Sequence, residues 1–417
     1  MKFSRVLSTS ACVLAGALGL PAAASALPHS NATNLHSEHV CPAPSPGGVA
    51  CDALVVTQNG HPFRGKPTSS STIAGYYPAD LQSAYGLAAS ASSGAGQTVA
   101  LVDAYDDPNA ASDLATYRNE FGLPALSTCT VSGGTVSSPG GPCFTKVGET
   151  GSPTSLPGKN GGWAEEESLD VDMVSAICPQ CNIVLVEANK PSTADLGTAV
   201  NTAASLGATE ISNSYGGNES TNDPTYDSQY YNHPGIAVTA SSGDSGYGVE
   251  YPAASPDVTA VGGTSLSRAS GTTRGWSETA WSGAGAGCSA DDPQPAWQSA
   301  VVNLAAACAN RAVADVSFDA DPNTGVAVYD SYSYQGYSGW LVFGGTSVGS
   351  PSIASVYARA GNAGSVTYGS YPYSHTSALN DVTSGSDGTC SLAVLCTAGP
   401  GWDGPTGLGT PNGTGAF

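Results

Sequence analysis

The segment GGTSVGSP, residues 344–351, places Ser347 between a glycine pair and a helix that we predict over 347–360. Glycine lets another backbone approach closely, and the first turn of a helix leaves backbone N–H donors unpaired. Pro351 is compatible with that first turn. The pattern therefore favours Ser347 as a nucleophile, and a serine nucleophile needs a base to take its proton.

The six histidines do not provide a well-supported base. Four lie in an N-terminal stretch without periodic pattern and two in loops, and none opens a helix beside glycine: His29, His36, His39 and His61, and His233 and His375. A triad built on histidine is therefore poorly supported.

A pair of acidic residues offers an alternative base. The stretch WAEEESLDVDMVSAIC, residues 163–178, predicts a helix on which Glu166 and Asp170 share one face with Val174 and Ile177. Carboxyl groups aligned with apolar residues point inward, where burial separates their pKa values. An acidic helix start favoured by the helix dipole explains the run EEE equally well and stays open as the simpler interpretation.

Acidic surroundings would favour a carboxylate over an imidazole. At about pH 4, a histidine of ordinary pKa near 6.5 is already protonated, whereas a glutamate near 4.3 can still accept a proton. Asp244 in SSGDSG could then act as a protonated oxyanion donor, although a tight turn after a strand also explains it. Only 11% of residues are charged, and the pI of about 4.3 is compatible with work at acidic pH.

The N-terminus indicates export. Lys2 and Arg5 precede an apolar run over 11–24, and a small-residue ASA sequence ends at Ala26, so we predict a signal peptide over 1–26. We expect a soluble, secreted, monomeric protein. The formal net charge of −21 argues against binding to nucleic acid or an anionic membrane.

Ten of the 11 cysteines follow the signal peptide, as expected for disulfides in an oxidising compartment. They form five couples that are close in sequence: 41 with 51, 129 with 143, 178 with 181, 288 with 308, and 390 with 396. The CPQC motif over 178–181 has the spacing of half a zinc site, but a second such motif and nearby histidines are missing from the sequence. We therefore favour a disulfide clip.

Beyond the signal peptide, we expect an irregular N-terminal arm or short pro-segment over 27–75 and a single catalytic domain over 76–417. Near-continuous apolar strands alternate there with helices, which predicts an α/β fold with a doubly wound parallel sheet. The expected strands are 98–105, 182–188, 209–216, 236–243 and 258–265, and the expected helices are 110–120, 164–177, 193–206 and 347–360. Asp103, SYGGNE and SGDSG end strands and should gather at the sheet edge where sites form.

From Tyr76 to Phe417 the sequence resembles the sedolisin family of serine-carboxyl peptidases, which have a subtilisin-like fold. The motifs that carry the resemblance, in this order, are PADLQSAYGL, E-x-x-L-D at 166–170, SSGDSG, VADVSFDADPNTGVAVY, GGTSVGSP, DVTSG and GWDGPTGLGTP. The resemblance implies that Ser347 is the nucleophile and Glu166 the general base. It also implies that Asp170 orients this base and that Asp244 stabilises the oxyanion. Asp103 stands where related enzymes extend the carboxylate network, usually with Glu.

The same resemblance implies a structural calcium site near the C-terminus. Its ligands would be Asp381 and Asp403 together with the carbonyl groups of Val382, Gly399 and Gly401, a set of oxygen donors suited to Ca²⁺. A glycine-rich turn with solvated aspartates is the simpler alternative.

Three features depart from the family pattern. The family generally carries a large folded pro-domain, whereas about 50 residues separate the signal from the domain here. Tyr215 stands where relatives often have Trp, and Gly344–Gly345 replaces Ser-Gly before the nucleophile.

Together these features predict a secreted endopeptidase that cleaves proteins or peptides at acidic pH through an acyl-enzyme. The alternative from another class is a catalytically inactive, peptidase-fold binding protein at the cell surface. A glycosidase using Glu166 and Asp170 ranks last, because two acids one turn apart on one helix do not readily flank a sugar ring.

Overall fold

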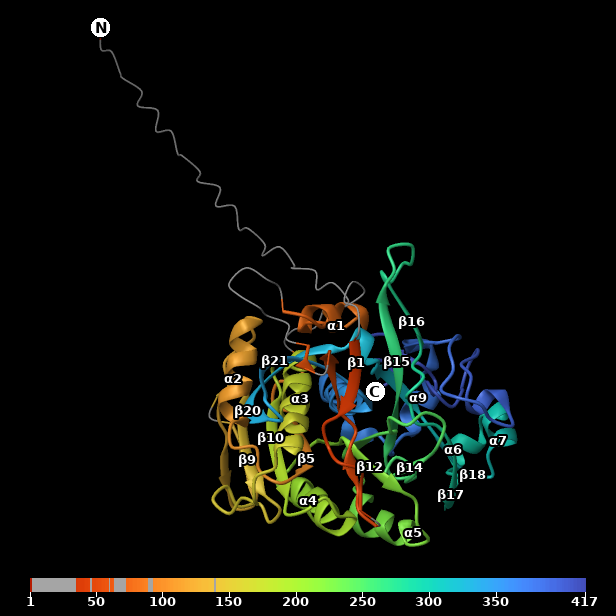
Figure 1. Cartoon of the computed structure of the whole chain (residues 1–417), viewed down its shortest axis with the longest axis horizontal. Helices are drawn as coiled ribbons and strands as arrows, with labels where there is room; N and C mark the ends of the chain where they lie inside the picture. Colours follow the sequence, from red (N-terminus) through yellow and green to blue (C-terminus); the bar gives the residue numbers. More distant parts are fainter. Residues whose placement is uncertain (2–34, 46, 60, 64–72, 89–92, 139) are drawn as a thin grey trace.

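The computed structural model describes residue 1 and residues 35–417, apart from 46, 60, 64–72, 89–92 and 139 (Figure 1). The predicted signal peptide lies outside these residues except for Met1, so the boundaries at 26 and 75 stay predictions. None of the helices in the described ranges combines the length and apolar character needed to cross a membrane.

A mostly parallel sheet forms the centre of the molecule, with the strand order β16-β15-β13-β11-β5-β10-β9-β6 and with β19 beside β15. All its pairings are parallel except that of β15 with β16. The strands are β5 (Thr98–Ala104), β6 (Ser127–Thr128), β9 (Cys143–Gly148), β10 (Asn182–Ala188), β11 (Glu210–Asn213), β13 (Ala237–Ser241), β15 (Thr259–Arg268), β16 (Trp276–Ala280) and β19 (Val316–Asp319). The five predicted strands are confirmed.

Helices cover both faces of this sheet. Because side chains alternate along a strand, Val99 and Leu101 of β5 pack with one set of helices and Ala100 and Val102 with another. The first set contains α2, α3 and α8, and the opposite face carries α4. The helices are α2 (Ala110–Glu120), α3 (Gly161–Ile177), α4 (Thr193–Ser205) and α8 (Gly349–Ala360). The predicted doubly wound α/β class is confirmed.

Helix α3 starts three residues before its predicted start, because Asn160 caps it. The Asn160 side chain accepts hydrogen bonds from the N–H groups of Gly162 and Trp163, which would otherwise be unpaired. Helix α8 is preceded by a 3₁₀ turn, Thr346–Val348, and stops at Gly361 in the left-handed conformation.

The N-terminal arm differs from the irregular segment that we expected. Strands β1 (Leu35–His39) and β3 (Leu54–Gln58) pair with each other, and β3 also pairs with β21 (Tyr337–Gly344), the neighbour of β20 (Val326–Tyr334). The short β2 (Ala50–Cys51) pairs with β12 (Tyr215–Asn218). In the view of Figure 1, β1 appears between α3 and β15. The described part of the arm is therefore built into the structure of the α/β domain.

All five predicted disulfides are confirmed: Cys41–Cys51, Cys129–Cys143, Cys178–Cys181, Cys288–Cys308 and Cys390–Cys396. The CPQC motif is thus a disulfide clip.

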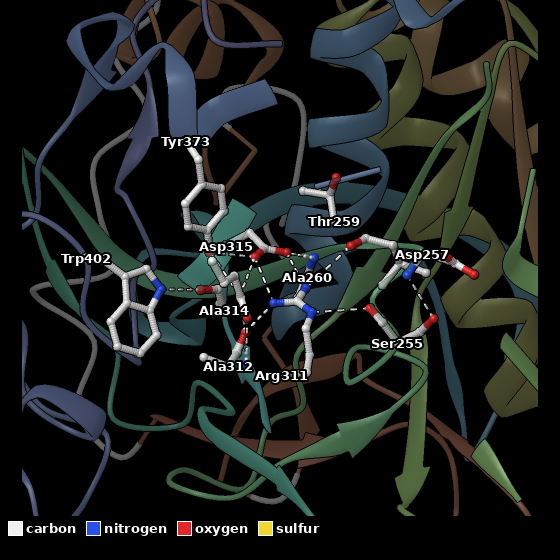
Figure 2. Close-up of polar contacts among 12 residues, drawn as sticks. Ser255, Asp257, Thr259, Ala260, Arg311, Ala312, Ala314, Asp315, Tyr373 and Trp402 are labelled. Atoms are coloured by element: carbon white, nitrogen blue, oxygen red, sulfur yellow. Dashed lines mark hydrogen bonds and ion pairs between the residues drawn. The ribbon is translucent and has the colours of Figure 1, made fainter. Parts of the chain in front are cut away.

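One fully buried ion pair joins β18 (Asn310–Val313) to the loop before β19 (Figure 2). The guanidinium group of Arg311 contacts both carboxylate oxygens of Asp315. The Asp315 carboxylate also accepts hydrogen bonds from the Ala260 N–H at 2.8 Å and the Tyr373 hydroxyl at 2.8 Å. Because both groups are paired and hydrogen-bonded, these contacts offset the cost of burying them inside the protein.

Candidate active site

Ser347 lies in the turn Thr346–Val348 between β21 and α8, and its side chain is fully buried. Gly345 enters this turn with φ of 97°, in the region that favours glycine. A Cβ atom at this position would collide with the carbonyl oxygen of Asp52 and with the Oδ2 atom of Asp244. The glycine pair noted in the sequence therefore lets two other segments approach the turn that carries Ser347.

Glu166 and Asp170 lie on α3, which packs directly against the turn that carries Ser347. Both side chains are fully buried, which supports the inward-facing interpretation over an exposed acidic helix start. Burial raises the pKa of Glu166 well above its usual value, and the neighbouring Asp170 and Asp103 raise it further. The hydroxyl group of Ser347 acts in the opposite direction on this pKa.

The Ser347 hydroxyl itself donates to the carbonyl oxygen of Ser214 at 3.3 Å. Neither carboxyl oxygen of Glu166 has a hydrogen bond of good geometry within the described part of the chain. Glu166 therefore lies near enough to Ser347 to sense its hydroxyl, while that hydroxyl points to Ser214.

Ser214 connects Asp170 with Ser347. Its hydroxyl donates to Oδ1 of Asp170 at 2.8 Å, while its carbonyl oxygen accepts from Ser347. The pKa of Asp170 is raised well above its usual value by burial and by Asp103, and the Ser214 hydroxyl opposes this rise. Sequence reasoning placed Ser214 in the SYGGNE segment at a strand end but gave this residue no role of its own.

Asp103 is near the end of β5, fully buried, and neither of its carboxyl oxygens has a hydrogen-bond partner among the described residues. Burial raises its pKa to about 8. It interacts electrostatically with Glu166, Asp170 and also Glu167. Asp103 thus belongs to the same buried acidic cluster.

Asp244 approaches Ser347 from the other side, in the loop after β13. Its Oδ1 atom accepts the N–H of Thr346 at 2.7 Å and the Thr346 hydroxyl at 2.9 Å. Burial raises its pKa well above the usual value, and Asp52 and Glu250 add to the rise. Its Oδ2 atom faces Gly345 and has no partner in the part of the chain described. A neutral Asp244 could use this atom as a hydrogen-bond donor.

A segment of the N-terminal arm also enters the site, which the sequence did not predict. The N–H of Ser347 donates to the carbonyl oxygen of Asp52, and the N–H of Asp52 donates to the carbonyl oxygen of Ser214, each at 3.2 Å. Asp52 follows directly after Cys51, but nothing local to this position indicates contact with residues 160 to 300 positions away. A cavity of about 420 Å³ adjoins this segment and is lined by Asp52, Asp244 and Glu250 among others.

The Tyr215 side chain bonds to Asn213 and not to the proposed base. Its hydroxyl donates to Oδ1 of Asn213 at 2.7 Å, and its ring centroid lies 6.5 Å from that of Trp163.

The residues expected to bind calcium lie in two neighbouring turns. Oδ2 of Asp403 accepts the N–H of Gly399 at 2.9 Å, and Oδ2 of Asp381 accepts the N–H of Gly401 at 3.1 Å. Burial raises the pKa of Asp403 to about 7, and the nearby Asp381 also raises it. The side chain of Val382 is buried. Two like-charged carboxyl groups are thus close together beside glycine-rich backbone, a donor set that fits a hard cation.

Two curated proteins are similar over most of the chain. Kumamolisin from Bacillus sp. (strain MN-32) is 32% identical over 393 residues, which cover 84% of this chain and 64% of that protein. Sedolisin from Pseudomonas sp. (strain 101) is 28% identical over 386 residues, which cover 83% of this chain and 61% of that protein. The chain therefore spans a little less than two thirds of the length of these relatives.

A solved structure of Pseudomonas sedolisin, a serine-carboxyl proteinase in complex with two molecules of pseudo-iodotyrostatin, matches with a TM-score of 0.65. The match has 25% identity and covers 81% of this chain and 95% of that one. It agrees with the subtilisin-like arrangement predicted from the sequence. No protein-family model matches the chain.

Proposed function

The chain belongs to the sedolisin family, and from this premise we propose that it is a serine-carboxyl endopeptidase that hydrolyses peptide bonds at acidic pH. One observation carries the proposal: Glu166 from α3 and Asp244 from the loop after β13 both converge on the buried turn that carries Ser347. The alternative of an inactive binding protein is not favoured, because all the predicted catalytic side chains are present.

The base must be ionised to accept a proton. Glu166, Asp170 and Asp103 are adjacent and buried, so they cannot all be charged and they titrate as a group. The first negative charge is best stabilised where a hydroxyl group faces it. Ser347 provides that group for Glu166 and Ser214 provides it for Asp170. We therefore assign the negative charge of the active form to the pair Glu166 and Asp170, which the two hydroxyl groups face.

Catalysis then follows the chemistry of acyl transfer. The Oγ atom of Ser347 attacks the substrate carbonyl carbon while Glu166 takes the hydroxyl proton. Glu166 later gives that proton to the leaving amine. The Ser347 N–H and a protonated Asp244 donate to the oxyanion that develops. Water, deprotonated in turn by Glu166, hydrolyses the acyl-enzyme.

The decisive experiment is Ser347→Ala, assayed on a denatured protein at about pH 4. We expect the rate to fall at least about 10³-fold, because the covalent step is lost. Ser352→Ala is a matched control, because this serine is also buried in α8 and, among the described residues, its hydroxyl bonds only to the carbonyl of Val348. Retained activity in Ser347→Ala would contradict the proposed nucleophile.

A calcium ion held by Asp381, Asp403 and the carbonyl groups of Val382, Gly399 and Gly401 is part of the proposal. It would join two C-terminal turns and neutralise their like charges. We expect a chelator to lower the melting temperature of the wild type but not that of Asp381→Asn. An equal response of both proteins would contradict the site.

We further propose that the protein is exported and acts as a monomer. The signal-peptide pattern over 1–26 and the five disulfides support export. Mass spectrometry of the culture medium and of the cells, with sizing of the released protein, tests both statements.

A further inference from the structure

The segment from Val49 to Ala53 lies across the candidate active site as a peptide strand. The Val49 N–H donates to the carbonyl of Pro191 at 3.1 Å, while Ala50 and Cys51 pair antiparallel with β12 on the other side. The segment before Asp52 is therefore held between two backbone edges. This is the strand-addition mode by which extended peptides bind at open edges.

Both backbone polar groups of Asp52 are hydrogen-bonded to residues of the candidate active site, the carbonyl oxygen to Ser347 and the N–H to Ser214. The carbonyl oxygen of Asp52 takes the N–H of Ser347, the donor that the mechanism assigns to the oxyanion. Its own N–H and the Ser347 hydroxyl point to the same acceptor, the carbonyl oxygen of Ser214. The hydroxyl and the N–H group of Ser347 thus both lie at the backbone of residue 52. A substrate residue that contributes the carbonyl group of the cleaved bond would occupy this position.

The chain is also fixed on the far side of this residue. Leu54 and Val55 pair with Gly344 and Phe343 of β21. The Val40 N–H donates to the carbonyl of Ala53, and β1 pairs with β3 along its whole length. Cys41–Cys51 closes the loop from within. Both sides of the Asp52–Ala53 bond are therefore anchored, as in a substrate held ready for attack.

The side chain of Asp52 occupies a polar pocket that is almost completely closed, with only 5% of the residue exposed. Ser241, at the end of β13, donates its hydroxyl to Oδ2 of Asp52 at 2.6 Å. The carboxyl group of Glu250 forms another wall, because it lies against Gly216 and Gly243, where any Cβ atom would collide with it.

We propose that Asp52–Ala53 is an internal substrate bond and that the pocket of Ser241 and Glu250 selects peptide bonds that follow a short side chain with an acceptor oxygen, aspartyl or its isostere asparaginyl. This inference rests on the proposed function. The Ser347 Oγ would attack the Asp52 carbonyl carbon and pass its proton to Glu166. Breaking the C–N bond releases the amine of Ala53 with that proton, and water converts the acyl-enzyme to the α-carboxyl group of Asp52.

The acidic surroundings determine the charge that the pocket accepts. Glu166, Asp244 and Glu250 all interact electrostatically with Asp52. Burial raises the pKa of Asp52 to about 7 although Ser241 opposes the rise, and burial raises that of Glu250 to about 8. At about pH 4 the pocket therefore holds neutral groups. A lysine there would bury an unpaired charge, and a leucine would leave the Ser241 hydroxyl unpaired.

The test uses four peptides that copy residues 48–57 with Ser in place of Cys51 and with Asp, Asn, Leu or Lys at position 52. The full chain is assayed with each at about pH 4. We expect cleavage after position 52, with kcat/KM at least about tenfold higher for Asp and Asn than for Leu and Lys. Equal rates, or a preference for Lys as partner of an ionised Glu250, would overturn the proposal.

Changing the pH separates Asp from Asn. A free aspartyl side chain ionises near pH 3.9 but must be neutral when bound, whereas Asn has no such requirement. The pKa of the aspartyl side chain is higher in the bound peptide than in the free peptide. Binding of the Asp peptide is therefore fully favourable below the free pKa and is lost as the pH rises above it. The ratio of the Asp to the Asn rate should fall by roughly tenfold per pH unit from about 4 to 6. A constant ratio would overturn the neutral-acid pocket.

Two neighbouring serines give a matched pair of variants. Ser241→Ala should lower the ratio of the Asp to the Leu rate by about fivefold, because one hydrogen bond is lost. Ser242→Ala should leave the ratio unchanged, because this buried hydroxyl has no partner within the described residues. Equal effects of both changes would overturn the role of Ser241.

The double variant Cys41→Ser/Cys51→Ser frees the loop and distinguishes two kinds of failure. If neither the wild type nor this variant cleaves a denatured protein, the proposed function fails. If either cleaves the denatured protein, but no peptide is cut after position 52, only the inference about the loop fails.

Discussion

Two buried groups of ionisable side chains in this molecule are built on opposite principles. Around Asp315, a guanidinium group, a backbone N–H and a tyrosine hydroxyl all point to one carboxylate (Figure 2). Around Ser347, the fully buried carboxyl groups of Glu166, Asp170 and Asp103 have neither a basic partner nor a full set of hydrogen bonds within the described chain.

The difference separates structure from chemistry. A charge whose partners are all present can stay ionised and hold segments together, but it is not free to exchange a proton. Buried acids without a cation have raised pKa values and exchange protons at an energetic cost that neighbouring dipoles can adjust. The first cluster should therefore govern stability and the second should govern activity.

The largest expected effect is on catalysis. Glu166→Gln should lower kcat/KM at least about 10³-fold, while raising the free energy of unfolding at neutral pH because one buried acid is removed. Steady-state kinetics and urea unfolding measure the two quantities. Glu165→Gln is the control, since this buried acid on the same helix faces Asp330. A similar loss of activity in both variants would show that Glu166 has no role in catalysis beyond that of any buried acid on this helix.

The opposite result is expected for the paired cluster. Asp315→Asn should lower the free energy of unfolding by about 3 to 5 kcal/mol, because it leaves Arg311 charged and buried without a counterion. The folded fraction should keep its kcat. Asp257→Asn is a control from the same region, because Asp257 is only half-buried and forms no ion pair among the described residues. A change in kcat as large as that of Glu166→Gln would contradict the comparison.

The pH dependence of stability should reflect the unpaired acids. The folded-state pKa is about 8 for Asp103 and for Glu210 and about 9 for Glu165, in each case chiefly because of burial. For an acid whose folded pKa is raised, stability is fully present below the unfolded value near 4 and is lost as the pH rises through the folded value. We expect the free energy of unfolding to fall between about pH 4 and 8, by up to about 1.4 kcal/mol per pH unit for each group.

Asp103→Asn sharpens this expectation, because it removes one titrating group and should flatten the curve. Chemical unfolding at several pH values provides the measurement. If stability instead rises from acid to neutral pH, these acids are ionised in the folded protein.

The smallest effect is expected for Tyr215→Phe. Its hydroxyl bonds to Asn213 and not to the base, so its loss should cost about 1 kcal/mol of stability and change kcat/KM less than about threefold. A much larger loss of activity would place Tyr215 in the proton network.

Sequence patterns were sufficient for the framework of the sheet. The apolar runs of β5, β10 and β13 predict buried parallel strands, and the spacing of Glu166 and Asp170 places both on one helix face. The pattern did not decide whether that helix face is buried, because an exposed acidic first turn is compatible with the same sequence. Burial in the folded chain decides in favour of the inward orientation.

The arm and its place in the site were beyond sequence reasoning. The short run LVVTQ of β3 has no feature that separates it from other short segments with polar flanks. Its pairing with β21 joins residues almost 290 positions apart. Likewise, Ser241 and Asp52 meet only because β12, β13 and the turn that carries Ser347 come together in space. Local propensity and periodicity contain no information about such distant partners.

The ring closed by Cys41–Cys51 also suggests a route to inhibitors. A synthetic macrocycle with the same ring and Asp52 at its edge would already have the shape that the cleft holds, so it would lose little conformational freedom on binding. Replacing the Asp52–Ala53 amide by an uncleavable bond would turn this piece of the protein into a lead compound against the proposed nucleophile, Ser347.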